Sequence, residues 1–141
     1  MNYAGLFAAL GSLLVVILVM YVLLIIANWK IFTKAGEAGW ASLVPIYNGY
    51  VLFKISWDVK YFWIMLVLAV IEGIGQSIGD TAGNIITIVS GIPIIVLTFM
   101  QVNKLSKAFG HGTGFTLGMI FLPNIFSLIL GFGGDQYLGP Q

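Results

Sequence analysis

The sequence contains no cysteine, no arginine and only one histidine, His111. The absence of cysteine excludes disulfides, thiol catalysis and thiolate metal sites. A lone histidine has no partner at the spacing of a metal site, so we expect His111 to be a loop residue and expect neither a metal nor a cofactor. The formal net charge of +1 argues against a nucleic-acid partner, because neutralising phosphates requires clustered cations.

Charged residues of either sign are also scarce, at 8% of the chain against 60% hydrophobic residues. Globular chains carry roughly 25% charged residues, and a domain this short cannot bury so much apolar surface. Three long stretches carry no charged side chain: 1–29, 81–103 and 112–134. The composition therefore predicts an all-α integral membrane protein, with residues 1–141 forming a single membrane domain.

Three apolar stretches have the roughly 20 residues that a helix needs to cross a membrane: 5–27, 61–79 and 84–102. The first is not expected to be a cleaved signal peptide, because no lysine precedes it and its apolar run is too long. Two further stretches, 40–55 and 115–132, are ambiguous. The expected fold is a bundle of three or four transmembrane helices with one or two proline-broken re-entrant or interfacial helices.

The lysines predict how the chain crosses the membrane. Cytoplasmic loops carry an excess of cations, and all six lysines lie between the first and second spans or after the third: Lys30, Lys34, Lys54, Lys60, Lys104 and Lys107. This pattern places the N-terminus outside and both lysine-bearing segments inside, provided that 40–55 does not cross. The side of the C-terminus depends on whether 115–132 crosses, which the sequence leaves open.

Prolines interrupt both ambiguous stretches, Pro45 in the first and Pro123 in the second. Proline lacks the backbone donor and clashes with the preceding helical turn, so we expect a hinge at each position. Tryptophan and tyrosine, which prefer the headgroup level, flank Pro45. The stretch 40–55 is therefore predicted to lie in the interface or to enter the membrane partway.

The two stretches also suggest a parallel internal repeat. Each follows an apolar span and contains Lys-Ala, a glycine-rich turn, Gly-aromatic and then a proline: Lys34-Ala35, Gly39-Trp40 and Pro45 against Lys107-Ala108, Gly114-Phe115 and Pro123. The glycine-to-proline spacing differs by three residues, so the match is loose. The alternative is that membrane proteins commonly reuse lysine, glycine and proline at helix ends.

Glu72 is the one ionisable residue well inside a predicted span. An acid near the membrane centre costs about 2.5–3.5 kcal/mol on insertion scales, so a compensating interaction is expected. A neutral carboxyl could hydrogen-bond a neighbouring helix, or an ionised one could line a proton or cation path. Gln76 lies one turn further on and is predicted to share its face.

Two other sets of residues are candidates for packing and lipid contact. Gly75 and Gly79 form a small-residue pair that permits close approach of a second helix. Lys104 and Lys107 precede a glycine-rich turn and are candidates for an anionic lipid headgroup, with snorkelling at the membrane surface as the alternative. The turn at 109–115 lacks the Gly-Lys-Ser/Thr ending of a phosphate-binding loop.

Three segments together resemble a family of small polytopic bacterial membrane proteins of unknown function: WKIFTKAGEAGWASLVPIYN, LSKAFGHGTGFTLGMIFLP and GFGGDQYLGP. The resemblance covers about 29–140. In some members a similar segment is fused ahead of signal peptidase I, and the peptidase's catalytic residues belong to that fused domain. The resemblance therefore implies a bacterial cytoplasmic membrane protein, supplies no catalytic residue, and hints at a link to envelope or export machinery.

The expected function is non-enzymatic, because Ser42 has no triad-like partners at local spacing and no other hydrolase constellation is recognisable. We expect an accessory or scaffold subunit that associates with the lipid bilayer and with other membrane subunits or copies of itself. The alternative is a small channel or transporter in which Glu72 couples ions, since proline-broken segments in corresponding halves of a chain are typical of transport sites.

Overall fold

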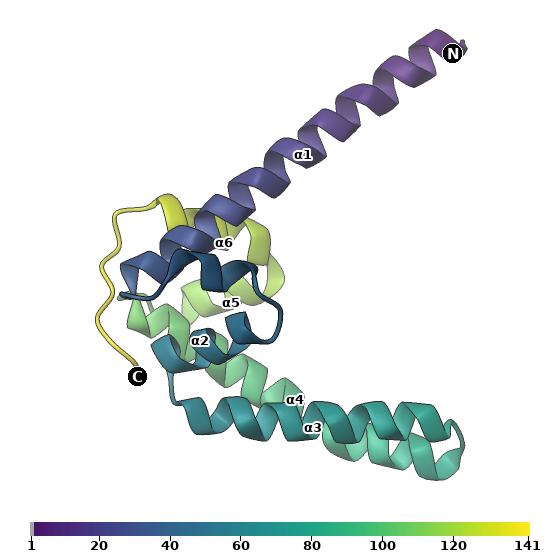
Figure 1. The fold of residues 1–141 in the computed structure, drawn as a ribbon, viewed down its shortest axis with the longest axis vertical. Helices are drawn as coiled ribbons and strands as arrows, with labels where there is room; N and C mark the ends of the chain where they lie inside the picture. Colours follow the sequence, from purple (N-terminus) through teal and green to yellow (C-terminus); the bar gives the residue numbers. More distant parts are fainter. Residues whose placement is uncertain (1) are drawn as a thin grey trace.

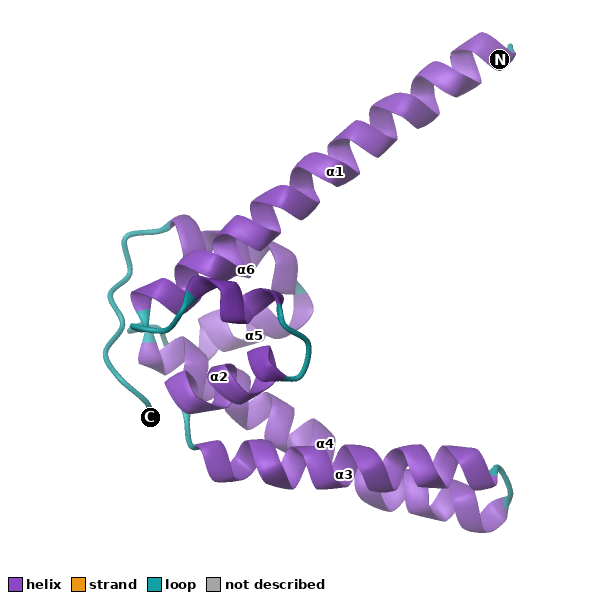
Figure 2. Cartoon of the chain, in the orientation of Figure 1, coloured by secondary structure: helices purple, strands orange, loops and turns teal. Residues whose placement is uncertain are grey.

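The computed structural model describes residues 2–141, and within that range all of the regular secondary structure is helical, with no strand (Figure 2). Three helices are long and apolar enough to cross a membrane: α1 (Tyr3–Lys34), α3 (Val59–Ile78) and α4 (Thr81–Ala108). They cover the three spans expected from the sequence except Gly79, which follows the last residue of α3. Each is longer than predicted, because the helices continue through polar residues that a hydropathy window leaves out.

The remaining helices are short: the 3-10 helix η1 (Gly39–Leu43), α2 (Tyr47–Ser56), α5 (Thr113–Phe121) and α6 (Pro123–Phe132). A helix of 10 residues is about 15 Å long, half of the hydrocarbon thickness. The stretch 115–132 is therefore not one continuous fourth span. It is divided between α5 and α6.

The break between η1 and α2 and the break between α5 and α6 both occur at the predicted prolines. Pro123 is the first residue of α6, where a missing backbone donor costs nothing. Pro45 precedes a tight turn in which the Tyr47 amide donates to the Pro45 carbonyl over 2.7 Å. The central residue of that turn, Ile46, has φ 67° and ψ −52°, the geometry of the rare and strained γ-turn.

The α3–α4 hairpin is built from capping residues. Asp58 accepts a hydrogen bond from the Lys60 amide at the start of α3, and Asp80 accepts one from the Gly83 amide at the start of α4. Between them, Gly79 ends α3 in the left-handed conformation with φ 71°. Carboxylates at helix starts and glycine at a helix end are the expected solutions for unpaired backbone groups.

The short helices pack with the lysine-bearing ends of α1 and α4 into a compact body. Its buried apolar residues are Ile31, Phe32, Ala41, Val51, Ile55, Leu105, Ala108, Phe109, Met119 and Leu130. The rest of α1 and the α3–α4 hairpin project from the body as two separate arms (Figure 1). The arms spread apart towards the same side of the body. The η1–α2 and α5–α6 breaks face the space between them (Figure 2).

The proposed repeat can be compared at its first turn. The Glu37 amide donates to the Phe32 carbonyl and the His111 amide to the Ser106 carbonyl, both over 2.9 Å. Gly36 and Gly110 occupy the left-handed position in these turns, with φ 80° and 83°. This geometry aligns Gly36 with Gly110. That alignment differs by one residue from the sequence comparison, which aligned Lys34-Ala35 with Lys107-Ala108. Because such turns end many helices, the shared geometry does not establish a repeat.

Candidate functional site

The α3–α4 interface depends on glycine, although not on the pair predicted from the sequence. Gly75 is buried, and a Cβ at that position would lie 2.8 Å from Thr87 Oγ1 and 3.0 Å from the Gly83 carbonyl oxygen. The partner of Gly75 is thus Gly83 on α4. A Cβ at Gly79 would meet only its own helix, at 3.9 Å, so Gly79 serves the turn rather than the interface.

Glu72 is half-buried and faces α4 at Gly91. Its Oε1 atom lies 3.9 Å from the position that a Gly91 Cβ would take. Among the described residues the carboxyl has no hydrogen-bond or ion-pair partner. Gln76 lies one turn on but is exposed, so the structure does not bring the two side chains together in a polar pair.

A hollow of about 300 Å³ lies along the outer part of the hairpin. It is lined by Leu68, Ile71, Ile85, Ile86, Val89 and Ser90. Ser90 is the one polar side chain in this lining, and its hydroxyl donates to carbonyls of its own helix. This surface suits apolar neighbours better than water or ions.

The lysines proposed for a lipid headgroup differ in their surroundings. Lys104 is half-buried, and its Nζ lies 3.4 Å from the Gln141 carbonyl oxygen. Lys107 is exposed near the end of α4. The C-terminal segment thus contacts Lys104, whereas Lys107 remains exposed.

The segment 133–141 crosses the body in an extended conformation and binds the ends of two helices. The Leu138 amide donates to the Ala108 carbonyl over 2.7 Å, and the Gln141 amide donates to the Ser56 carbonyl over 2.9 Å. The Tyr137 hydroxyl donates to the Ile55 carbonyl over 2.6 Å. Helix ends leave carbonyls without intrahelical partners, and this segment supplies the missing donors for α2 and α4.

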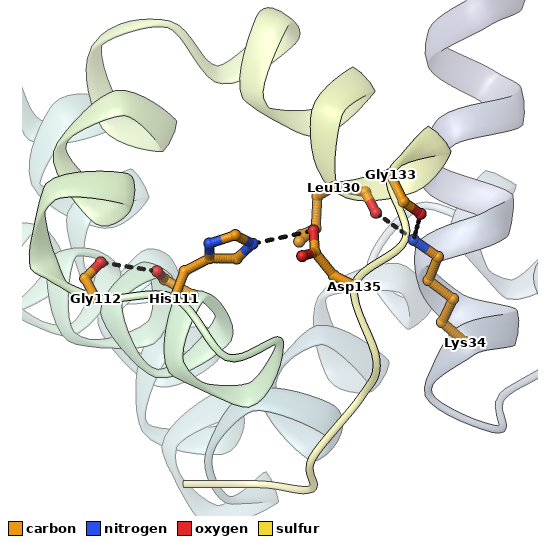
Figure 3. A network of polar contacts seen from close by, with 7 residues as sticks. Lys34, His111, Gly112, Leu130, Gly133 and Asp135 are labelled. Atoms are coloured by element: carbon orange, nitrogen blue, oxygen red, sulfur yellow. Dashed lines mark hydrogen bonds and ion pairs between the residues drawn. The ribbon is translucent and has the colours of Figure 1, made fainter.

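A polar cluster anchors the start of the same segment (Figure 3). Lys34 Nζ donates to the carbonyls of Leu130 and Gly133 over 2.6 and 2.8 Å, which caps the end of α6. His111 Nε2 lies 3.0 Å from Asp135 Oδ2, and its ring stacks on Phe115 at 3.9 Å. The histidine–carboxylate contact is an ion pair only when the imidazole is protonated, and it is not a well-directed hydrogen bond.

Sequence reasoning placed His111 in a loop without a partner and missed Asp135. The two residues are far apart in the chain, and no local pattern links them. The Ser106 hydroxyl, at the helix end that precedes the His111 turn, is fully buried and donates to the Gly112 carbonyl over 3.0 Å. Across residues 2–141 no three histidine, aspartate or glutamate side chains gather as metal ligands. The cluster holds the C-terminal segment in place.

The Tyr137 hydrogen bond gives a testable pH dependence. Burial raises the pKa of the phenol above its ordinary value of 10.0, with the nearby Glu37 charge as a second cause. The neutral phenol is the donor, so its contribution is complete below pH 10 and is lost as the pH rises through the raised pKa. Tyr137→Phe removes the bond at every pH. At about 1 kcal/mol, the detached fraction should rise roughly fivefold.

The measurement is the fluorescence anisotropy of a dye on Gln136→Cys, in a chain that has no other cysteine. We expect lower anisotropy in the Tyr137→Phe variant at neutral pH, and a fall in the parent protein only above pH 10. Tyr3→Phe, on the exposed N-terminal turn of α1, is the control. Equal anisotropy in all three at neutral pH would show that Tyr137 does not hold the segment.

Exposed apolar side chains gather at the two breaks that face the space between the arms. Ile46 at the first break is 67% exposed and Phe121 at the second is 76% exposed. Their exposed neighbours are Trp40, Leu43, Val44, Tyr47, Leu122 and Ile125. Apolar surface on this side is compatible with contact with hydrocarbon.

A model described as a family of unknown function, DUF5684, matches residues 40–140. No curated protein and no solved structure matches the chain.

Proposed function

The chain belongs to the family of unknown function DUF5684, and we propose that it is a non-enzymatic multi-pass protein of the bacterial cytoplasmic membrane that serves as an accessory or scaffold subunit. In this proposal α1, α3 and α4 cross the bilayer and the compact body lies at the cytoplasmic face. The partners are other membrane subunits or further copies of the chain. A link to envelope or export machinery is part of the proposal.

The distribution of charge supports this orientation. Lys30, Lys34, Lys54 and Lys60 lie where α1 and α3 meet the body or within it, and Lys104 and Lys107 lie at the body end of α4. The N-terminus and the Asp80 turn lie at the far ends of the arms and carry no lysine. Cationic residues are retained on the cytoplasmic side, so the N-terminus would be outside. The docked C-terminal segment would be cytoplasmic.

The breaks at Pro45 and Pro123 then act as shallow re-entrant tips. Their exposed apolar side chains would enter the cytoplasmic leaflet, while the body covers the polar backbone behind them. Irregular backbone at membrane depth requires such cover.

The observation that carries the scaffold proposal is the isolation of α1. From Leu6 to Val22 its large apolar side chains are exposed on every face, and its packing partners are η1 and α6 at the body end. By contrast, α3 and α4 pack along each other. A long helix that no other span of its own chain covers offers its whole surface to the helices of other proteins.

Site-specific photocrosslinking tests this proposal in native membranes. A photoreactive residue at Val15, which is 60% exposed, should give one discrete protein adduct that mass spectrometry can identify. The matched position is Phe32 in the same helix, an aromatic side chain that is 2% exposed and should give none. Lipid adducts alone at Val15, and likewise along the rest of α1, would contradict the scaffold proposal.

The second candidate, ion-coupled transport, is favoured by one observation: the carboxyl of Glu72 faces α4 without a polar partner. Under the scaffold proposal we expect Glu72→Gln to leave the Val15 adduct and the unfolding temperature unchanged. The same variant should show no change in proton or cation flux in proteoliposomes. If the parent protein conducts ions and Glu72→Gln abolishes that flux while assembly stays intact, the transport proposal would replace the scaffold proposal.

A further inference from the structure

A groove separates the η1–α2 turn from the first turns of α3. Its volume is about 520 Å³, with Pro45, Ile46 and Tyr47 on one wall and Phe62, Trp63 and Leu66 on the other. Ligand sites of roughly 300–1,000 Å³ are typical of small molecules.

Aromatic rings pack together between the two walls of the groove. Tyr50 meets Phe62 edge-on at 5.6 Å and Trp63 at 6.3 Å, and Tyr47 stacks on Tyr50 at 5.9 Å. Tyrosine and tryptophan favour the level of the lipid headgroups. In the proposed membrane placement, the groove begins at that level and faces lipid along the first turns of α3.

The wall formed by Ile46 is held in a strained conformation. A β-branched residue at positive φ is a backbone outlier, yet the Ile46 side chain is 67% exposed and gains little packing within the chain. Outliers of this kind persist where the position of the side chain serves a function. Here the turn holds an apolar side chain over the groove.

Charges around the groove are balanced. Lys54, one turn beyond Tyr50, pairs with Glu37 over 2.9 Å, and this pairing raises the pKa of the lysine. Lys60, one turn before Trp63, lies two residues from Asp58, whose carboxylate carries the opposite charge and accepts a hydrogen bond from the Lys60 backbone amide. The surroundings thus offer neither a net positive nor a net negative field to a headgroup.

We propose that this groove binds one acyl chain of a phospholipid from the leaflet next to the body, without selecting an anionic headgroup. The apolar walls bind the acyl chain, and the balanced charges around the groove accept zwitterionic and anionic headgroups equally. This inference rests on the proposed membrane placement of α3. Lipid binding would explain the strained turn at Ile46, which packing within the protein does not explain.

The test uses Trp63 as the reporter, with the chain's three other tryptophans, Trp29, Trp40 and Trp57, replaced by phenylalanine. This protein is reconstituted into vesicles of unlabelled phosphatidylcholine with increasing fractions of brominated phosphatidylcholine or brominated phosphatidylglycerol. A bound chain predicts quenching that rises above the value for random lipid contact and saturates. Half-saturation should occur at the same fraction for both headgroups.

The decisive variant is Ile46→Gly, because glycine adopts positive φ without strain. It should unfold at the same temperature as the parent or higher, while half-saturation shifts by roughly tenfold through loss of one apolar wall. Leu43→Ala, an exposed apolar position outside this groove, is the matched control and should not shift it.

Failure of the inference and failure of the membrane placement give different results. Quenching that rises in proportion to the brominated fraction, identically in the parent and in Ile46→Gly, would show ordinary bilayer contact and overturn the site. Trp63 protected from both lipids would show that protein covers the groove and would also overturn it. Release of the protein from vesicles by alkaline carbonate would instead refute the membrane placement.

Discussion

Replacing Gly131 by alanine should weaken the junction between α6 and α1 and lower the thermal unfolding midpoint in detergent. A Cβ at Gly131 would lie 2.6 Å from both the Cα and the carbonyl oxygen of Ala27, which is 0% exposed. The crowding atoms belong to the backbone of α1, so no side-chain rotation relieves the overlap. Overpacking of this kind costs about 1–3 kcal/mol, or roughly 3–9 °C for a chain of this size.

The control for this prediction is Gly134→Ala, three residues further on. A Cβ there would meet no atom within 4 Å, so its midpoint should match that of the parent. Differential scanning fluorimetry in one detergent measures all three proteins. Equal midpoints for Gly131→Ala and Gly134→Ala would mean that α6 does not rest on α1 at this position.

Replacing Gly83 by alanine should force α3 and α4 apart. The new Cβ would overlap the Gly75 carbonyl oxygen and would also lie 3.1 Å from Ile78 Cβ. Axial separations of packed helices vary over 8–10 Å with the side chains at the contact. We therefore expect the hairpin to widen by about 1–2 Å and the protein to lose about 1–3 kcal/mol of stability.

Spin labels on Ile74→Cys and Ile88→Cys measure the separation, since both positions are exposed and the chain has no native cysteine. Gly73→Ala is the matched control, because its Cβ would meet nothing within 4 Å. Alanine also favours the helix over glycine by up to about 1 kcal/mol, so this control should be neutral or stabilising. An unchanged distance distribution in Gly83→Ala would show that the close contact between Gly75 and Gly83 does not set the separation of α3 and α4.

The long helices were predictable because apolar runs of membrane-spanning length are a strong and local signal. Their limits were less so: the predicted spans 61–79 and 84–102 begin after the true helix starts at Val59 and Thr81. The capping aspartates, Asp58 and Asp80, mark both starts in the sequence. Giving capping residues the same weight as hydropathy would have placed both helix starts correctly.

The candidate site was less accessible to sequence reasoning, because its contacts join distant segments. Gly75 was identified from its spacing to Gly79, but the partner that requires glycine is Gly83 on the next helix. Local spacing cannot distinguish a glycine that ends a helix from one that packs against another helix. Asp135 had no local signal at all, since its partner His111 is brought near by α5 and α6.

The C-terminal segment also affects when the body can form during synthesis. The Tyr137 hydroxyl contacts the Ile55 carbonyl across 82 residues of sequence, and α3 and α4 lie between them in the chain. Contacts at such separation close slowly, because the entropy of the intervening chain is lost first. While a ribosome is still making the hairpin, the end of α2 therefore has a carbonyl without its final donor. The body closes after all three long helices have been made.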